Sequence, residues 1–189
     1  DECSVSGMVR AHVAAKECGI KLIVGAEFAV HDVPGIERLL LFAQNRNGYG
    51  DLCELITLAR SRTVKGKYRL LTADLTHLPD CLAVLLPHVH RPHVEDNIAA
   101  LCGMFPEHCW LGAAHRYGAD EEGALARLMD LADQFSLPIA ACDPVLFALR
   151  EDKPMQDVLT AVRLKKPVAE LGTELLAHAE HYLKPIPKL

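Results

Sequence analysis

The fold is decided by a stretch that reads LLLFAQNRNGYGDLCELITLAR over residues 39–60. Residues 39–43 are apolar and have the length of a short strand, whereas residues 49–60 repeat apolar side chains at helical spacing. Asparagine and glycine separate the two segments and favour a turn. A strand that leads through a turn into a helix is the building unit of α/β domains.

The same alternation continues over most of the chain. The expected strands are apolar on both faces, which is typical of strands covered by helices; they are residues 21–24, 39–43, 82–86, 110–114 and 138–142. The expected helices are residues 4–18, 49–60, 121–135, 155–164 and 168–182. This order predicts an α/β fold with parallel strands and outer helices.

Two of these helices carry local signals at their ends. The first helix is expected to bury a stripe that includes Val9 and Val13, and to end at Gly19. Asp120 is expected to cap the helix that follows it.

Composition limits what the chain can do. Its 189 residues are 50% hydrophobic, which allows a sizeable core, and its net charge of -5 excludes strong autonomous binding to DNA phosphates. Seven cysteines without a CxxC pair indicate reduced thiols in a cytosolic protein. No apolar run approaches the roughly 20 residues of a membrane span, and no leader pattern is present.

The pattern changes near residue 150. Residues 1–150 alternate strands and helices, whereas residues 151–189 predict a helical tail that ends in a proline-rich segment and leads away from the sheet. Because the chain starts at Asp1 rather than methionine, we expect a fragment whose first strand is missing. Strand edges left unpaired in this way predict a marginally stable or self-associating chain.

Polar side chains follow several of the expected strands, where the loops of a parallel α/β barrel open onto one rim. The residues are Glu27, Gln44, Asn45, His88, His90, His115 and Asp143, and Asp1 and Glu2 are expected to end the missing first strand. Carboxylates and imidazoles gathered on one rim can hold hydrolytic metal ions. The alternative is that these are ordinary polar loops.

Two local candidates stand out within this set. His88 and His90 are two residues apart and could share a zinc ion, but the prolines around them favour a surface loop. Glu27 directly follows an expected strand and comes two residues after Gly25, which permits close approach of another group. A solvated surface carboxylate is the alternative for Glu27.

Four colinear stretches resemble the PHP domain of bacterial error-prone relatives of the DNA polymerase III alpha subunit. They read DECSVSGMVRAH over residues 1–12, AAKECGIKLIVGAE over 14–27, LFAQNRNGYGDLCEL over 41–55, and QDVLTAVR with PVAE over 156–163 and 167–170. The resemblance covers nearly the whole chain. It implies an incomplete, distorted (β/α)7 barrel that lacks the first strand with its His-x-His motif.

The resemblance also implies a set of metal ligands. Asp1 and Glu2 match the family's Thr-Asp-His or Thr-Asp-Glu motif, Glu27 matches its Gly-x-Glu ligand, and His115 matches a histidine near the end of a strand. Asp143 lies one residue out of register with the family's Asp-x-His.

Other ligand positions of the family hold different residues in this chain. An ungapped alignment puts Pro144 and Leu146 at the Asp-x-His positions, and Arg38 stands where replicative relatives often have histidine. These departures imply a degenerate site for zinc or manganese.

The resemblance implies a function through a larger protein. The parent would be a DNA-directed DNA polymerase, a nucleotidyltransferase that uses magnesium in replication and repair of damaged DNA in the cytoplasm. This portion would act as an inactive scaffold and interaction domain that contacts the remaining polymerase chain, with DNA bound only through the parent and no membrane contact.

Two alternatives remain open. The first is a metal-dependent phosphoesterase acting on phosphate esters or a DNA 3' end, with Glu2, Glu27, His115 and Asp143 around the ion. The second is a gene remnant.

Overall fold

The computed structural model describes residues 1–114 and 120–185. The chain divides into two compact units, residues 1–140 and 141–189, which are described separately below. The domain boundary expected after residue 150 stays a prediction.

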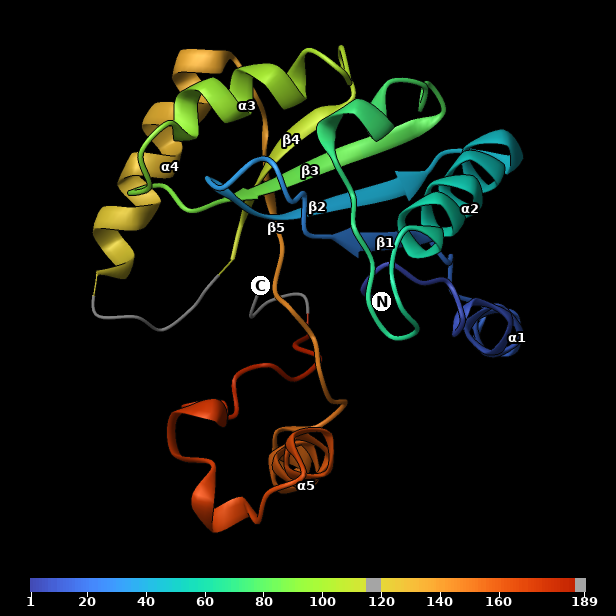
Figure 1. Ribbon diagram of the computed structural model, residues 1–189, viewed down its shortest axis with the longest axis vertical. Coiled ribbons are helices and arrows are strands. Elements are labelled where there is room, and N and C mark those ends of the chain that lie inside the picture. Colours follow the sequence, from blue (N-terminus) through green and yellow to red (C-terminus); the bar gives the residue numbers. More distant parts are fainter. Residues whose placement is uncertain (115–119, 186–189) are drawn as a thin grey trace. The chain divides into compact units, whose positions relative to one another are not determined.

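The first unit is built on a five-stranded sheet whose strands lie side by side in chain order (Figure 1). The strands are β1 (Gly25–Phe28), β2 (Ile36–Ala43), β3 (Cys81–Pro87), β4 (Cys109–Ala113) and β5 (Ile139–Ala141). The expected α/β class is confirmed, and four of the five strands fall where the sequence predicts them. Within the described residues, β1 and β5 are the two ends of the sheet.

The expectation of parallel strands throughout is wrong. β2 is antiparallel to both β1 and β3, and β3 is parallel to β4. Only a few residues join β1 to β2, too few for the crossover of about a dozen that a parallel pair requires. After β2 come a helix, a loop of residues 62–69 that we call the return loop, and a further segment that leads to Cys81. Cys81 lies opposite Ala43, so β3 begins where β2 ends.

The strand expected at residues 21–24 is also displaced. Pairing with β2 starts at Gly25, which lies opposite Phe42, and the amide of Ala43 still donates to the carbonyl of Val24 at 2.9 Å. Because β2 ends at Ala43, the residues before Val24 have no partner strand and remain outside the sheet.

Helices lie around the sheet (Figure 1). In the first unit they are α1 (Met8–Cys18), α2 (Arg46–Ser61), α3 (Val94–Cys102) and α4 (Glu121–Phe135). α2 packs on β2, α3 on β2 and β3, and α4 on β4. Asn45 caps α2, because its side-chain oxygen accepts from the amides of Asn47 at 2.8 Å and Gly48 at 3.1 Å.

Two helix expectations need correction, and one helix of the structure was not predicted. α1 ends at Gly19 as predicted, but none of its residues is buried, and Val9 is 76% exposed. Periodicity shows which face of a helix can be covered, and not whether anything covers it. The side chain of Asp120 does not cap α4. The sequence analysis did not predict α3, which begins after His93. His93 has a φ of 62° and no side-chain cap, so no residue pattern marks the start of this helix.

The core of the first unit lies between the central strands and their helices. Its largest fully buried side chains are Phe28, Leu39, Leu41, Leu52, Leu70, Leu75, Leu85, Ile98, Leu101, Leu111 and Leu131. β3 is buried along nearly its whole length, which explains why its sequence is apolar on both faces. Among the described residues, no helix has the length and apolar character needed to cross a membrane.

The second unit contains one α-helix, α5 (Lys153–Leu164), among the residues described. The helix expected over residues 168–182 is wrong, because two short 3-10 turns, Val168–Glu170 and Gly172–Glu174, occupy part of that range. Gly172 has a φ of 50°, a left-handed conformation that a continuous right-handed helix cannot contain. The unit is fastened by ion pairs between Arg150 and Glu180, and between Lys184 and Asp143.

Candidate functional site

The amino-terminal residues pair with the outer edge of β1. The amide of Glu27 donates to the carbonyl of Asp1 at 3.0 Å, and the amide of Cys3 donates to the carbonyl of Glu27 at 2.8 Å. Glu2 and Glu27 thereby become parallel bridge partners. The structure brings three of the five predicted ligand residues together along the backbone.

The register across the sheet places four side chains on one face. Glu2 is paired with Glu27, and Glu27 is paired with Leu40 of β2. Paired residues share a face of the sheet, as do residues two apart on one strand. Arg38, two residues before Leu40, therefore lies on the same face as Glu2 and Glu27.

The carboxylate of Glu2 has partners within the protein. Its Oε1 accepts a hydrogen bond of 2.8 Å from the hydroxyl of Tyr68, and it lies 3.9 Å from Nη2 of Arg38. The Arg38 and Glu2 side chains are 36% and 46% exposed. Glu2 thus sits in a polar cluster of a phenol, a carboxylate and a guanidinium.

Tyr68 joins three segments of the chain at this cluster. Its hydroxyl donates to Glu2 and also accepts from the amide of Ala29 at 2.7 Å, and its ring meets His31 edge-on at 5.6 Å between centroids. Burial raises the pKa of Tyr68 to about 12, with a further increase from Glu2, whereas the Ala29 amide and Arg38 oppose that shift. The phenol is therefore a neutral donor near neutral pH.

A second guanidinium holds the amino-terminal segment from the end of α2. Nε of Arg60 donates to the carbonyl of Cys3 at 2.8 Å, and its Nη2 donates to the carbonyl of Glu2 at 3.5 Å. Cys3 is fully buried, and burial raises the pKa of its thiol. This thiol is poorly suited to act as a thiolate ligand or nucleophile.

Side chains at residues 31 and 32 fasten the far end of the return loop. Nδ1 of His31 lies 3.2 Å from the carbonyl of Leu70, and the Asp32 carboxylate accepts from the hydroxyl of Thr72 at 2.7 Å. The amide of Thr72 also donates to Asp32. Together with Tyr68, these contacts fix the segment that follows the loop against residues 29–32, which come directly after β1.

That the two remaining predicted ligands, Asp143 and His115, join this cluster stays a prediction. Asp143 belongs to the second unit, where its carboxylate pairs with the ammonium of Lys184. His115 lies outside the described residues.

The histidines of residues 87–93 do not converge. His88 faces Glu37 at 3.9 Å, while His90 and His93 lie 3.5 and 3.4 Å from Asp120 and Asp96. Each imidazole pairs with a different carboxylate, so no shared ion is indicated.

The described residues do not fit a metal ion. Among residues 1–114 and 120–185, no group of three or more histidine, cysteine, aspartate or glutamate side chains could hold one. The carboxylate best placed for the role, that of Glu2, is engaged by Tyr68 and Arg38. The full set of Asp1, Glu2, Glu27, His115 and Asp143 stays a prediction, because His115 is not described.

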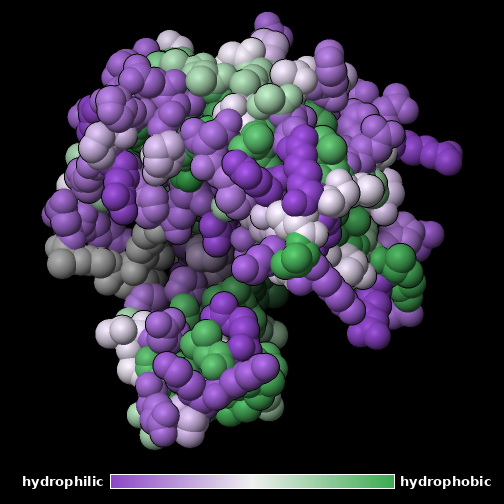
Figure 2. Space-filling model, viewed as in Figure 1, coloured by the Kyte–Doolittle hydropathy of each residue, from purple (hydrophilic) through white to green (hydrophobic). Residues whose placement is uncertain are grey.

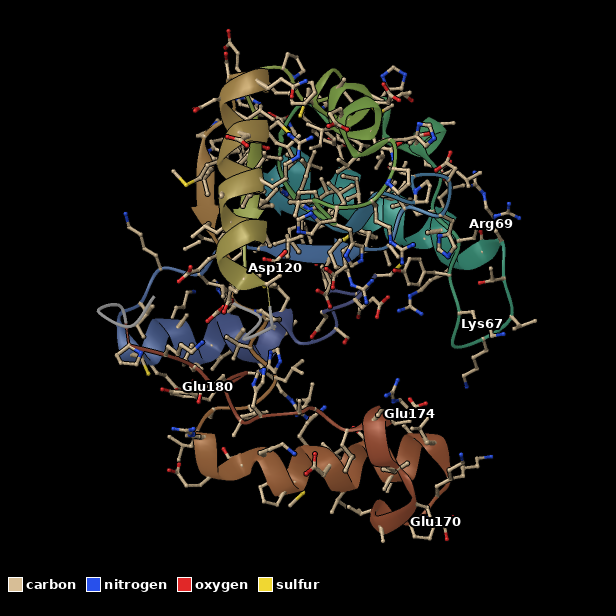
Figure 3. The ribbon with its side chains drawn as sticks, turned by 90° about the vertical axis from the view of Figure 1, so that its left-hand side faces the viewer. Lys67, Arg69, Asp120, Glu170, Glu174 and Glu180 are labelled. Carbon is tan, nitrogen blue, oxygen red and sulfur yellow. The ribbon has the colours of Figure 1, made fainter. Side chains whose placement is uncertain are left out.

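Sequence reasoning missed Tyr68 and Arg60, which organise the cluster. Arg60 reads as the polar end of an amphipathic helix, and Tyr68 as part of a basic loop. Figure 3 shows the neighbouring Lys67 and Arg69 extending from that loop. Because Tyr68 contacts Ala29 and Glu2 only through folding, no local motif could have revealed it.

Comparison with known proteins shows the family to which the chain belongs. Residues 1–130 match the PHP domain. The chain belongs to the PHP domain family. A protein named error-prone DNA polymerase from Methylococcus capsulatus is 44% identical over 188 residues, covering 98% of this chain and 18% of that protein. The protein of the same name from Pseudomonas aeruginosa is 40% identical over 190 residues, again covering 18% of its length.

A solved structure shares the PHP-like fold. It comes from Bifidobacterium adolescentis, and its description names a metal-dependent phosphoesterase. The two structures superpose with a TM-score of 0.54 at 13% identity, covering 75% of this chain and 73% of the other. At this identity the likeness concerns the fold alone. The chain spans about a fifth of the length of the curated polymerases that it matches.

Proposed function

We propose that this chain is the PHP portion of an error-prone DNA-directed DNA polymerase, and that it acts there mainly as a scaffold and interaction domain. The observation that carries this proposal is similarity over 98–100% of the chain to polymerases of which it spans only 18%. Nucleotide transfer with magnesium, contact with DNA, copying of damaged templates and cytoplasmic location are assigned to the longer protein.

The surface of α5 supports an interaction role. Four apolar residues repeat at helical spacing and are 47–69% exposed: Met155, Val158, Leu159 and Val162. Figure 2 shows apolar side chains at the surface of the second unit. Contiguous exposed apolar surface marks interaction sites in soluble proteins. We assign this face to contact with the remaining polymerase chain.

The sheet is proposed to form part of a distorted (β/α)7 barrel. The parallel pairing of Asp1–Cys3 with the outer edge of β1 supports continuation of the sheet beyond β1. The antiparallel pairs of β2 with β1 and β3 depart from the parallel strands that the sequence predicts for this barrel.

A metal-dependent phosphoesterase with zinc or manganese at Glu2, Glu27, His115 and Asp143 is the competing role. Nothing in the described geometry favours it, because Glu2 is already paired within the protein. Assays of the chain on phosphomonoesters and DNA 3' ends, with added manganese or zinc, are expected to show no turnover above buffer. Turnover that Glu27→Ala abolishes in a folded protein would overturn the scaffold role.

The interaction role has its own test. Met155→Asp with Leu159→Asp, introduced into a polymerase that contains this segment, is expected to lower its melting temperature by several degrees, because two charges would enter a contact surface. In the 189-residue chain, the same changes should alter the melting temperature little, since both positions are exposed. Equal effects in the two proteins would argue against contact through α5.

A further inference from the structure

Residue 38 occupies a distinct position in the sheet. The register between β2 and β3 shifts between Ile36 and Arg38, where one extra residue of β2 faces β3. Such a bulge redirects the side chains that follow it. Arg38 directly follows the bulge, and its guanidinium lies on the face of the sheet that carries Glu2 and Glu27.

Three contacts hold this guanidinium and its carboxylate in place. Nη1 of Arg38 donates to the carbonyl of Glu37 at 3.1 Å, while Nη2 faces Glu2 at 3.9 Å. Oε1 of Glu2 also accepts from Tyr68. The Glu2 carboxylate therefore has a cation and a donor supplied by the protein itself.

A fixed positive charge opposes a second one nearby. Two like charges repel more strongly near a protein surface than in water, and a divalent ion doubles the repulsion relative to a monovalent one. A metal ion bound by the Glu2 carboxylate would lie close to Arg38 and would share that carboxylate with the Tyr68 hydroxyl. The described residues contain no group of three or more ligands whose attraction for the ion could offset this repulsion.

We propose that the guanidinium of Arg38 replaces a divalent metal ion as the counter-charge of Glu2, and thereby excludes such ions from the edge formed by Glu2 and Glu27. The inference rests on the proposed scaffold role, because a site closed to metal retains its architecture without hydrolytic chemistry. Glu2, Arg38 and Tyr68 then serve to join the amino-terminal segment, β2 and the return loop.

The test is direct measurement of manganese binding to the 189-residue chain by the electron paramagnetic resonance signal of free Mn²⁺. Arg38→Gln is expected to raise the affinity at least about tenfold over the unaltered chain, since it removes the opposing charge. Adding Glu27→Gln to Arg38→Gln should abolish the gain. Arg38→Lys keeps the charge and should gain nothing.

Arg69→Gln is the matched control, because it removes an exposed guanidinium from the nearby loop (Figure 3). Circular dichroism identifies which variants fold. If Arg38→Gln does not, Arg38→Met retains the apolar stem of the side chain and takes its place.

Either of two results would overturn the inference: one equivalent of manganese bound tightly by the unaltered chain and lost in Glu27→Gln, or a folded uncharged variant that gains no affinity. Metal bound without phosphoesterase turnover would overturn this inference alone. Turnover dependent on Glu27 would overturn the proposed function as well.

Discussion

The two units use similar apolar patterns in different ways. In the first unit, β2 places Leu39 and Leu41 completely inside the core. In the second, α5 repeats apolar residues at helical spacing, yet Leu159 is 57% exposed and only Thr160 and Ala161 of the helix are buried. A hydrophobic pattern therefore identifies the surface of an element that can be buried. It does not identify the other element or chain that covers this surface.

The largest expected effect tests this contrast by a matched pair of leucines. Leu41→Ala should lower the free energy of unfolding by about 2–5 kcal/mol, because it leaves a cavity in the core. Leu159→Ala should change it by about 0.5 kcal/mol or less, because the side chain is already largely in water. Urea denaturation of the 189-residue chain measures both, and comparable losses would remove the distinction between the units.

Two glycines of α2 show how closely the first unit is packed. A Cβ at Gly48 would overlap the carbonyl of Asp80, whereas Gly50 has no atom within 4 Å of that position. Gly48→Ala should destabilise by about 1–3 kcal/mol through overpacking. Gly50→Ala should stabilise by about 0.5–1 kcal/mol, because alanine favours the helix. Denaturant midpoints of the two variants should move in opposite directions; a shared direction would contradict the close approach of α2 to residue 80.

A further expected effect concerns the polar edge of the first unit. Tyr68→Phe should cost about 1 kcal/mol, because the Ala29 amide and the Glu2 carboxylate each lose a partner. The pKa of Tyr68 is raised from 10.0 to about 12 in the folded state, so its contribution is present below pH 10 and is lost as pH rises toward 12.

This pH window provides the control for Tyr68→Phe. Melting curves of the two proteins should therefore converge between pH 10 and 12. A difference that stays constant over this range would show that the phenol does not titrate as the structure indicates.

The sequence predicted the elements of the first unit better than their pairing. Apolar runs located β2 to β5, of which β2 to β4 contain buried residues and β5 contains none, but the direction of β2 depends on how the chain returns from α2. The length of the connection indicates whether two strands are parallel or antiparallel, but only after both strands have been located. The region after α5 was mistaken for a helix because apolar spacing there outweighed Gly172.

The candidate site was partly accessible to sequence. Asp1, Glu2 and Glu27 were chosen from their places near strands, and pairing of their backbones brings them to one edge. Arg38 was noticed only as a departure from the family's ligands. Its contact with Glu2 depends on the pairing of β2 with β1 and of β1 with the amino-terminal residues, and the role of Tyr68 depends on a loop more than 30 residues after Ala29; neither leaves a local pattern.

The fastening of the return loop on both sides has a practical consequence for handling the protein. Arg60 anchors the chain before the loop, and His31 and Asp32 anchor it afterwards, while residues 64–67 are exposed. A protease cut or an inserted reporter peptide at Gly66 would leave both flanking segments attached to the sheet. The loop is thus the natural position at which to label the protein, or to divide it into two complementing halves.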